Sequence, residues 1–147
     1  MGPNPIILNG WTMTGGLTVY KSSSFFSHCT FDDFMSEDAL NIVSSSFTLD
    51  SCIFRNLYSD AFDGDFVQGE IYNCTFSFVQ GDGVDFSGST VSLADCTFAN
   101  IKDKAVSVGE GSEVNINSII VNEAGFGVVS KDTSTVSVRS SQIIGAS

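Results

Sequence analysis

The 147 residues fit one domain, and 17 acidic residues against 6 basic ones give a formal net charge of −11. This charge argues against nucleic acid as a partner, because binding a polyanion depends on basic side chains that neutralise phosphates. It also disfavours an anionic membrane surface. No apolar run approaches the roughly 18 residues that a spanning helix needs, so no membrane insertion is expected. Cations, neutral glycans and other proteins are the remaining partner classes.

Residues 1–15 precede the first clear repeat, and we expect them to form an N-terminal cap or lead-in. Trp11 follows the apolar run "IIL" in this segment. Apolar residues here suit a cover over the first coil of a repeat stack, because the ends of a solenoid need covering.

Residues 16–147 carry one repeat of 22–23 residues, marked most clearly by the cysteines. Each cysteine is followed two residues later by phenylalanine, and apolar residues alternate in stretches such as "VSL" and "CTF", which is typical of a strand with one buried face. A period of this length is too short for a helical repeat pair or a propeller blade, which need roughly 34 and 40 residues. We therefore predict an all-β fold, a single-stranded right-handed parallel β-helix (solenoid) of about six coils. The four pairs are Cys29 with Phe31, Cys52 with Phe54, Cys74 with Phe76, and Cys96 with Phe98.

The cysteines recur at one slot of this repeat, so stacking would place them in one internal column. We interpret them as unpaired buried thiols, because free cysteine is a small residue that suits a packed interior. Two disulfides are the alternative in a chain outside the cell.

Acidic residues recur on the same period, on either side of a small residue in each coil. Stacking would set like charges about 4.8 Å apart, and each such contact costs about 1 kcal/mol in water and about 3–4 at an effective dielectric of 20. Both positions can face outward only if the chain turns between them. The first acidic column reads Asp38, Asp60, Asp82 and then Lys104, and the second acidic column reads Asn41, Asp63, Asp85 and then Ser107.

Three interpretations of these columns stay open. The acids can be solvated turn residues, or they can bind Ca²⁺, which takes six to eight oxygen ligands. They can also serve as acid and base in glycoside hydrolysis, although no suitably placed His, Arg or Tyr joins them. The calcium candidates are Asp38, Asp60, Asp63, Asp82 and Asp85, and the catalytic candidates are Asp60, Asp63, Asp82 and Asp85.

The succession "EDALNIVSS", "SDAFDGDF", "GDGVDFSGS", "DKAVSVGEGS" and "GFGVVSKDTS" resembles right-handed β-helix regions of bacterial proteins. Such regions often lie beside spore-coat-protein-H-like kinase or lamin-tail-like modules, and the resemblance covers residues 16–140. A more distant similarity is to polygalacturonase-type glycoside hydrolases, whose active sites stack Asp residues on successive coils. Asp60 and Asp82 match such acids, whereas Lys104-Ala105 stands where that family has His-Gly.

The C-terminal stretch "TVSVRSSQIIGAS" is strand-like to its end, which predicts an open solenoid edge that invites pairing with another chain. We therefore expect a non-catalytic structural or binding module, extracellular or at the cell surface although no signal is visible. It would belong to a larger multidomain surface protein or associate end to end with copies of itself into a fibre, with calcium as a possible stabiliser. The alternative function is a carbohydrate-active protein that binds or hydrolyses polyuronate or another glycan with the stacked Asp residues.

Overall fold

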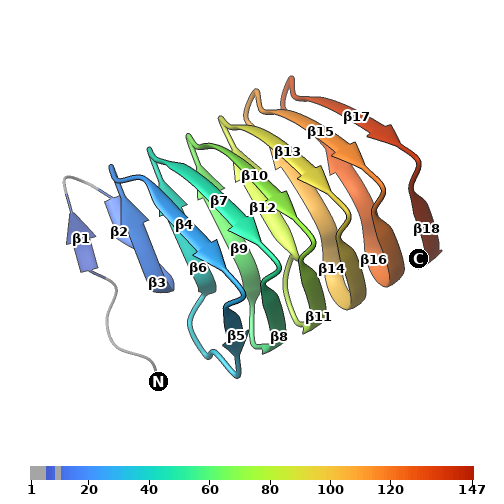
Figure 1. Cartoon of the computed structure of the whole chain (residues 1–147), viewed down its shortest axis with the longest axis horizontal. Coiled ribbons are helices and arrows are strands. Elements are labelled where there is room, and N and C mark those ends of the chain that lie inside the picture. The colour runs from blue at the N-terminus through green and yellow to red at the C-terminus, as the bar shows by residue number, and fades with distance from the viewer. Residues whose placement is uncertain (1–5, 9–10) are drawn as a thin grey trace.

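The structure is a computed structural model that describes residues 6–8 and 11–147, and every regular element in these ranges is a β-strand. Figure 1 shows the strands stacked in successive tiers, with the first and the last described strands at opposite ends of the stack. No helix in the described ranges is long and apolar enough to cross a membrane. The predicted all-β fold is therefore confirmed.

The N-terminal strands β1 (Ile6–Leu8) and β2 (Trp11–Met13) pair with each other in antiparallel fashion. Residues 1–5 and 9–10 of the predicted cap lie outside the described residues. The role of residues 1–15 as a cap therefore stays a prediction.

Each later turn of the chain forms one coil with three strands, and equivalent strands of successive coils pair in parallel (Figure 1). Face 1 is a six-stranded sheet, so the solenoid has six coils, as predicted. Face 1 consists of β4 (Ser24–Ser27), β7 (Ser46–Asp50), β10 (Gln68–Tyr72), β13 (Thr90–Ala94), β15 (Glu113–Asn117) and β17 (Thr135–Arg139).

Faces 2 and 3 are joined because two long strands, β14 (Thr97–Gly109) and β16 (Ile120–Ser130), run through both. Face 2 consists of β5 (Thr30–Asp32), β8 (Ile53–Leu57), β11 (Thr75–Val79), the first parts of β14 and β16, and β18 (Gln142–Ala146). Face 3 consists of β3 (Gly15–Tyr20), β6 (Asp38–Val43), β9 (Asp60–Asp65), β12 (Val84–Ser87) and the last parts of β14 and β16.

The coils turn at three corners, each marked by residues in the left-handed backbone region. Asn and Asp tolerate this region better than other L-residues, whereas a bulky side chain there is an outlier. For example, Leu93 and Cys96 are both core residues although they are three positions apart, because the chain turns at Asp95, which has φ 52°. After face 3 the corner residues are Lys21, Ser44, Phe66, Gly88, Glu110 with Gly111, and Asp132 with Thr133; after face 1, His28, Ser51, Asn73, Asp95, Ser118 and Ser140; and after face 2, Asp33, Asn56, Phe78, Asn100, Glu123 and Gly145.

Two columns of the interior repeat one residue type through four successive coils. The phenylalanine rings of β5, β8, β11 and β14 are nearly parallel, with centroid separations of 4.5 Å for Phe31–Phe54, 4.9 Å for Phe54–Phe76 and 4.7 Å for Phe76–Phe98. Stacked aromatic pairs contribute about 0.5–1.5 kcal/mol beyond the burial of their area. This phenylalanine ladder is therefore a principal source of cohesion between coils.

The cysteines form a second internal column and none is in a disulfide. Cys52, Cys74 and Cys96 are buried, and Cys29 is half-buried. The backbone N–H of Cys52 donates to Sγ of Cys74 at 3.4 Å, and burial raises the pKa of Cys52 to about 11. The prediction of unpaired buried thiols thus agrees with the structure for Cys52, Cys74 and Cys96, and Cys29 is unpaired but half-buried.

Replacing one ring of the phenylalanine ladder should destabilise the whole domain. We expect Phe76→Ala to lower the free energy of unfolding by about 3–5 kcal/mol, because a buried aromatic leaves a cavity between two coils. Thr75→Ala, the exposed neighbour on the same strand, is the matched control and should change it by less than about 0.5 kcal/mol. Chemical denaturation followed by circular dichroism measures both, and equal effects of the two changes would contradict the ladder's role.

Candidate metal centre

The strands of face 3 bend, and this bend places two acidic positions on the same side of the chain. Ala61 and Phe62 are consecutive, yet both are fully buried in the core. In a straight strand they would face opposite ways, so β9 must bend between them. The flanking Asp60 and Asp63 then both face away from the core. The predicted turn beside a small residue is confirmed, as a bend within a continuous strand.

The same bend recurs in neighbouring coils, where Ala39 with Leu40 and Ala105 with Val106 are likewise consecutive core residues. In the fourth coil the small residue is Gly83. A Cβ at this position would lie 2.6 Å from the backbone oxygen of Ala105 and 2.8 Å from the ring of Phe98. Close packing of the next coil therefore requires glycine there.

The first acidic column is linked from coil to coil through backbone N–H groups. Asp38 is paired in register with Asp60. The Oδ1 atom of Asp60 accepts the N–H of Asp82 at 2.7 Å, and Oδ1 of Asp82 accepts the N–H of Lys104 at 2.9 Å. These carboxylates thus also serve as structural acceptors between coils.

The second acidic column lies beside the first. Asn41, Asp63, Asp85 and Ser107 are in register on adjacent strands. The Nδ2 group of Asn41 donates to Oδ2 of Asp63 at 3.0 Å. Both predicted columns are therefore present with the predicted members.

Three carboxylates of the two columns converge on one point. One oxygen from each of Asp60, Asp82 and Asp85 lies within 4.8 Å of the other two. Asp82 and Asp85 come from the same coil, so the bend in face 3 brings them together, while Asp60 comes from the coil before. Among the described residues, no other group of three carboxylate, thiolate or imidazole ligands meets in this way.

The two remaining calcium candidates lie outside this group of three. Asp38 accepts a hydrogen bond from Oγ1 of Thr14, and Asp63 is held by Asn41. Asp65 was not among the candidate residues, but it is half-buried beside them. Burial and the charge of the neighbouring Asp85 raise its pKa. Its place two residues after Asp63 in an alternating strand was the sequence signal that could have included it.

The acids are more buried than a solvated turn would allow. The side chains of Asp38 and Asp82 are only 3% and 6% exposed, and Asp60, Asp63 and Asp85 are half-buried. The expectation of solvated turn acids is therefore wrong for Asp38 and Asp82. The physical reason is the bend, which makes outward-facing side chains of one coil crowd against each other and against those of the next coil.

This burial is the main cause of the raised pKa values in the group. Loss of water raises the pKa of Asp38 to about 7 and that of Asp60 to about 6. Burial, reinforced by the charges of Asp38 and Asp65, also raises the pKa of Asp63. Negative charge in this cluster is thus costly unless a cation neutralises it.

Lys104 supplies one such positive charge within the chain. Its Nζ lies 3.2 Å from Oδ1 of Asp82 and 2.8 Å from Oδ2 of Asp103. Burial raises the pKa of Asp82, and the backbone and side chain of Lys104 act against that rise. One lysine is shared between two acids, and Asp60 and Asp85 form no ion pair within the described part of the chain.

Unpartnered oxygens lie in the second acidic column. Four buried side-chain oxygens in the described chain lack a hydrogen-bond partner, and three of them, Thr18 Oγ1, Asn41 Oδ1 and Ser107 Oγ, belong to this column or extend it by one coil. Asn41 and Ser107 are 1% and 0% exposed. Buried polar groups are nearly always hydrogen-bonded in native proteins. These unpaired oxygens and the half-buried carboxylates beside them are groups that could bind a cation.

Comparison with known proteins identifies a family for most of the chain. The family model described as "Right handed beta helix region" matches residues 15–147. No curated protein and no solved structure matches the chain. The right-handed sense predicted for the solenoid agrees with this match.

The acid cluster should make the metal-free protein less stable as the pH rises. In the folded state Asp38 and Asp60 hold their protons up to about pH 7 and 6, whereas in the unfolded chain Asp loses its proton near pH 4. Since the folded state binds more protons in this interval, the free energy of unfolding falls as pH rises through it. Each pKa unit of difference corresponds to about 1.4 kcal/mol.

We therefore expect the melting midpoint in excess chelator to fall between pH 4 and pH 7, and Asp38→Asn to reduce that fall. Asp32→Asn is the matched control. The pKa of Asp32 is lowered by hydrogen bonds from Asn56 and Arg55, so its contribution is already complete above pH 4 and the slope should not change. A midpoint that rises over this interval would contradict the raised pKa values.

Proposed function

Since this chain belongs to the right-handed β-helix region family, we propose that it acts as a non-catalytic structural or binding module whose acidic columns bind Ca²⁺. One observation carries the proposal. Oxygens of Asp60, Asp82 and Asp85 meet within 4.8 Å, and the unpartnered Oγ of Ser107 belongs to the same column as Asp85.

The spacing of these oxygens suits calcium. Ca²⁺–oxygen distances are about 2.3–2.6 Å, so two ligands on opposite sides of one ion are about 4.6–5.2 Å apart. Mg²⁺ binds at about 2.0–2.1 Å in strict octahedral geometry and retains most of its waters, which fits a cluster of three carboxylates less well. A calcium ion here would offset the repulsion within the columns and join the third coil to the fourth.

A non-catalytic role agrees with how the acids are already used. Asp60 and Asp82 each accept a backbone N–H from the next coil, and Asp82 is almost entirely buried. A substrate therefore has little access to Asp82, and one carboxylate oxygen of Asp60 is already occupied by a backbone hydrogen bond.

Glycan binding or hydrolysis by Asp60, Asp63, Asp82 and Asp85 is the second candidate. The observation that favours it is the pKa of Asp60, raised to about 6, because a general acid works best with a pKa near the operating pH. Release of reducing ends from polygalacturonate, lost on Asp60→Asn, would support this alternative over the non-catalytic module.

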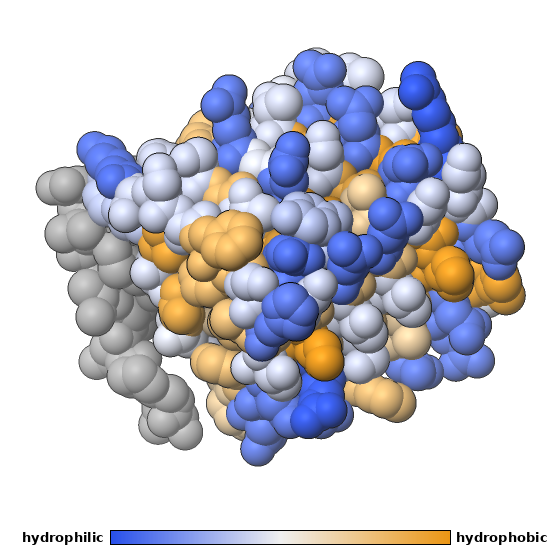
Figure 2. Space-filling view, in the orientation of Figure 1, coloured by the Kyte–Doolittle hydropathy of each residue, from blue (hydrophilic) through white to orange (hydrophobic). Residues whose placement is uncertain are grey.

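Two features of the last coil, its free strand edges and its exposed apolar side chains, favour association with a partner. Within the described chain, β17 pairs only with β15 and β18 only with β16, so each has a free edge. Val138, Ile143 and Ile144 on these strands are exposed, and Figure 2 shows hydrophobic surface at this end of the solenoid. Free edges and apolar surface favour addition of another strand.

We propose that these edges continue into another β-helix unit, either a second copy of the chain or a further segment of a multidomain surface protein. An extracellular or cell-surface location is part of this proposal, because sites of modest affinity are occupied by the millimolar calcium outside cells. Kinase-type neighbours, expected from the sequence resemblance, would belong to the same parent chain.

Calcium should stabilise the module measurably. At 100 times Kd the ligand adds about 2.7 kcal/mol, which for a chain of this size raises the melting midpoint by roughly 5–10 °C. We expect Asp85→Asn to abolish most of the shift and Ser107→Ala to weaken calcium binding, as measured by scanning fluorimetry and calorimetry.

Asp32→Asn is again the control, because Asp32 is an acid paired with Arg55 at 2.9 Å on face 2. Its calcium-induced shift should equal that of the wild type. No shift at millimolar calcium, or an undiminished shift in Asp85→Asn, would contradict the proposed site.

End-to-end association should depend on the last coil. We expect sedimentation velocity to show larger species as protein concentration rises, and Ile144→Lys on β18 to reduce them by placing charge at the free edge. Ile120→Lys is the matched control, because Ile120 is similarly exposed but lies on β16. A monomer at all concentrations would contradict self-association and leave continuation into a parent chain.

A further inference from the structure

A column of four cysteines lies at the corner between faces 1 and 2, whereas the converging acids belong to face 3. Each cysteine directly follows a corner residue in the left-handed backbone region. The strands that begin one residue later are in register from coil to coil, so the four side chains lie one above the next. All four are free thiols; Cys29 in the first coil is half-buried, and the other three are buried.

The last coil shows that this position of the corner does not require sulfur. There Oγ of Ser141 accepts the backbone N–H of Ile119 at 3.1 Å. In the cysteine coils, Sγ of Cys74 accepts the equivalent N–H of Cys52 at 3.4 Å. A serine hydroxyl therefore makes the same contact between coils as a cysteine thiol does.

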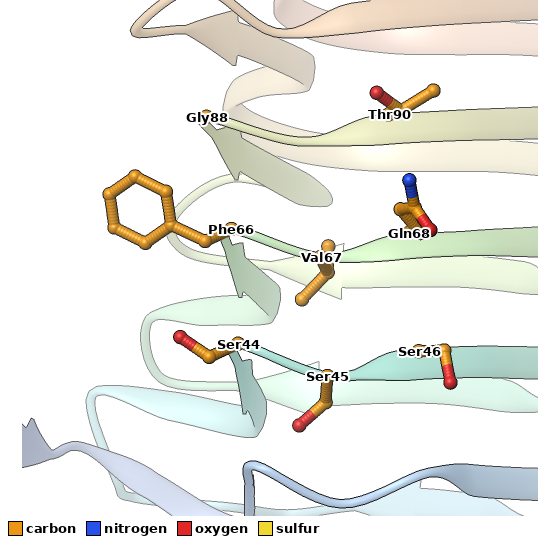
Figure 3. Close-up of a pocket in the computed structure, with 8 residues that line it drawn as sticks. All are labelled: Ser44, Ser45, Ser46, Phe66, Val67, Gln68, Gly88 and Thr90. Carbon is orange, nitrogen blue, oxygen red and sulfur yellow. The ribbon is translucent and has the colours of Figure 1, made fainter.

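The corner between faces 3 and 1 has serine at the matching position in most coils. Figure 3 shows this corner, with Ser45 and Val67 as the matching residues of two adjacent coils. Oγ of Ser89 accepts the N–H of Val67, and Oγ of Ser112 accepts the N–H of Ser89, both at 3.0 Å. Since serine satisfies the backbone at either corner, four successive cysteines point to a use of sulfur itself.

The backbone presents hydrogen-bond donors to these sulfurs. Burial raises the pKa of Cys52 to about 11, and a hydrogen bond from the backbone of Cys29 acts against that rise. Hydrogen bonds from the side chain and the backbone of Cys74 lower the pKa of Cys96, although burial opposes them. Hydrogen bonds to the charged form of a group favour that form. The column thus has donors for the thiolate state, in which cysteine binds metals.

The spacing of the column suits an ion that is bound by two sulfurs in line. Two residues further along the same strands, the ring centroids repeat at 4.5 Å from Phe31 to Phe54 and at 4.7 Å from Phe76 to Phe98. The step between coils is therefore close to the usual strand spacing of about 4.8 Å. A metal–thiolate bond is about 2.3 Å long, so two such bonds in line span about 4.6 Å. One step between coils thus matches the span of one two-coordinate ion.

Soft thiolate ligands select soft ions such as Cu(I). We propose that the cysteine column binds Cu(I), with each ion held between the thiolates of two adjacent coils. Each ion forms two metal–sulfur bonds, and the two thiols that it joins release their protons to solvent without any change of oxidation state. The half-buried Cys29 is the point of entry to the column.

This site goes beyond the calcium-binding module and is independent of it. No cysteine is among the converging carboxylates, and Ca²⁺ takes oxygen ligands. Asp85→Asn should therefore bind Cu(I) as the wild type does. A failure of calcium binding would leave this inference standing, and the reverse also holds.

The test is an anaerobic titration of the full, reduced chain with Cu(I) in competition with a Cu(I) chelator of micromolar affinity. The bound ions are counted after desalting, and the thiolate-to-copper absorption is followed in the ultraviolet. We expect the wild type to bind two ions per chain, because its four thiols form two adjacent pairs.

Two double variants with equal numbers of thiols separate adjacency in the column from simple thiol reactivity. Cys74→Ser with Cys96→Ser keeps the adjacent Cys29 and Cys52 and should bind one ion. Cys52→Ser with Cys74→Ser leaves Cys29 and Cys96 three coil steps apart and should bind none. Both should fold, as checked by circular dichroism, because Ser141 already occupies the same position of the column.

A second adjacent pair keeps the test decisive if one variant does not fold. Cys29→Ser with Cys52→Ser retains Cys74 next to Cys96 and should also bind one ion. The inference is overturned if the wild type takes no Cu(I) from the chelator, or if variants with adjacent thiols bind no more Cu(I) than the variant with separated thiols.

Discussion

Parallel, in-register stacking of the coils is the constraint on which every other feature depends. It places each residue directly above its counterpart one coil away, so each choice of side chain is repeated as a column. Phenylalanine gains from this arrangement, and the rings from Phe31 to Phe98 stack at 4.5–4.9 Å. Aspartate loses, because like charges meet at the same spacing with little water between them. The same geometry therefore creates both the cohesion of the core and the electrostatic problem that a cation would solve.

The bend in face 3 is what brings these acids together into the candidate metal centre. Two neighbouring core positions, such as Ala61 and Phe62, force the flanking acids onto one side, and the next coil then crowds them. Asp82 forms an ion pair with Lys104 and accepts its backbone N–H. The side chains of Thr18, Asn41 and Ser107, by contrast, each have an oxygen without a hydrogen-bond partner. The site is thus a by-product of core packing, and any change to the small residue at the bend would alter the spacing of the carboxylates.

The period of the cysteines and phenylalanines was enough to predict the coil number, the core columns and the free thiols, because identical slots leave an identical pattern in the sequence. The same period aligned Asp60 with Asp82 and Asp63 with Asp85. It could not predict their burial, since an outward-facing acid has the same spacing on a convex turn as on an inward bend. Phe66 and Phe78 were also beyond prediction, because phenylalanine gives no signal for a left-handed corner where Asn or Gly is usual.

The free edges of β17 and β18 have a consequence for how stability is distributed along the chain. In a solenoid each coil touches only the coils before and after it, so a coil's stability depends on how many neighbours it has. The sixth coil has one described neighbour, and its strand β18 is exposed throughout. Opening should therefore begin there and advance inward one coil at a time, so that Phe98 loses its neighbours before Phe54 does. Local stability therefore varies from coil to coil along the solenoid axis, and a partner bound to the last coil would raise the stability of the coils at that end.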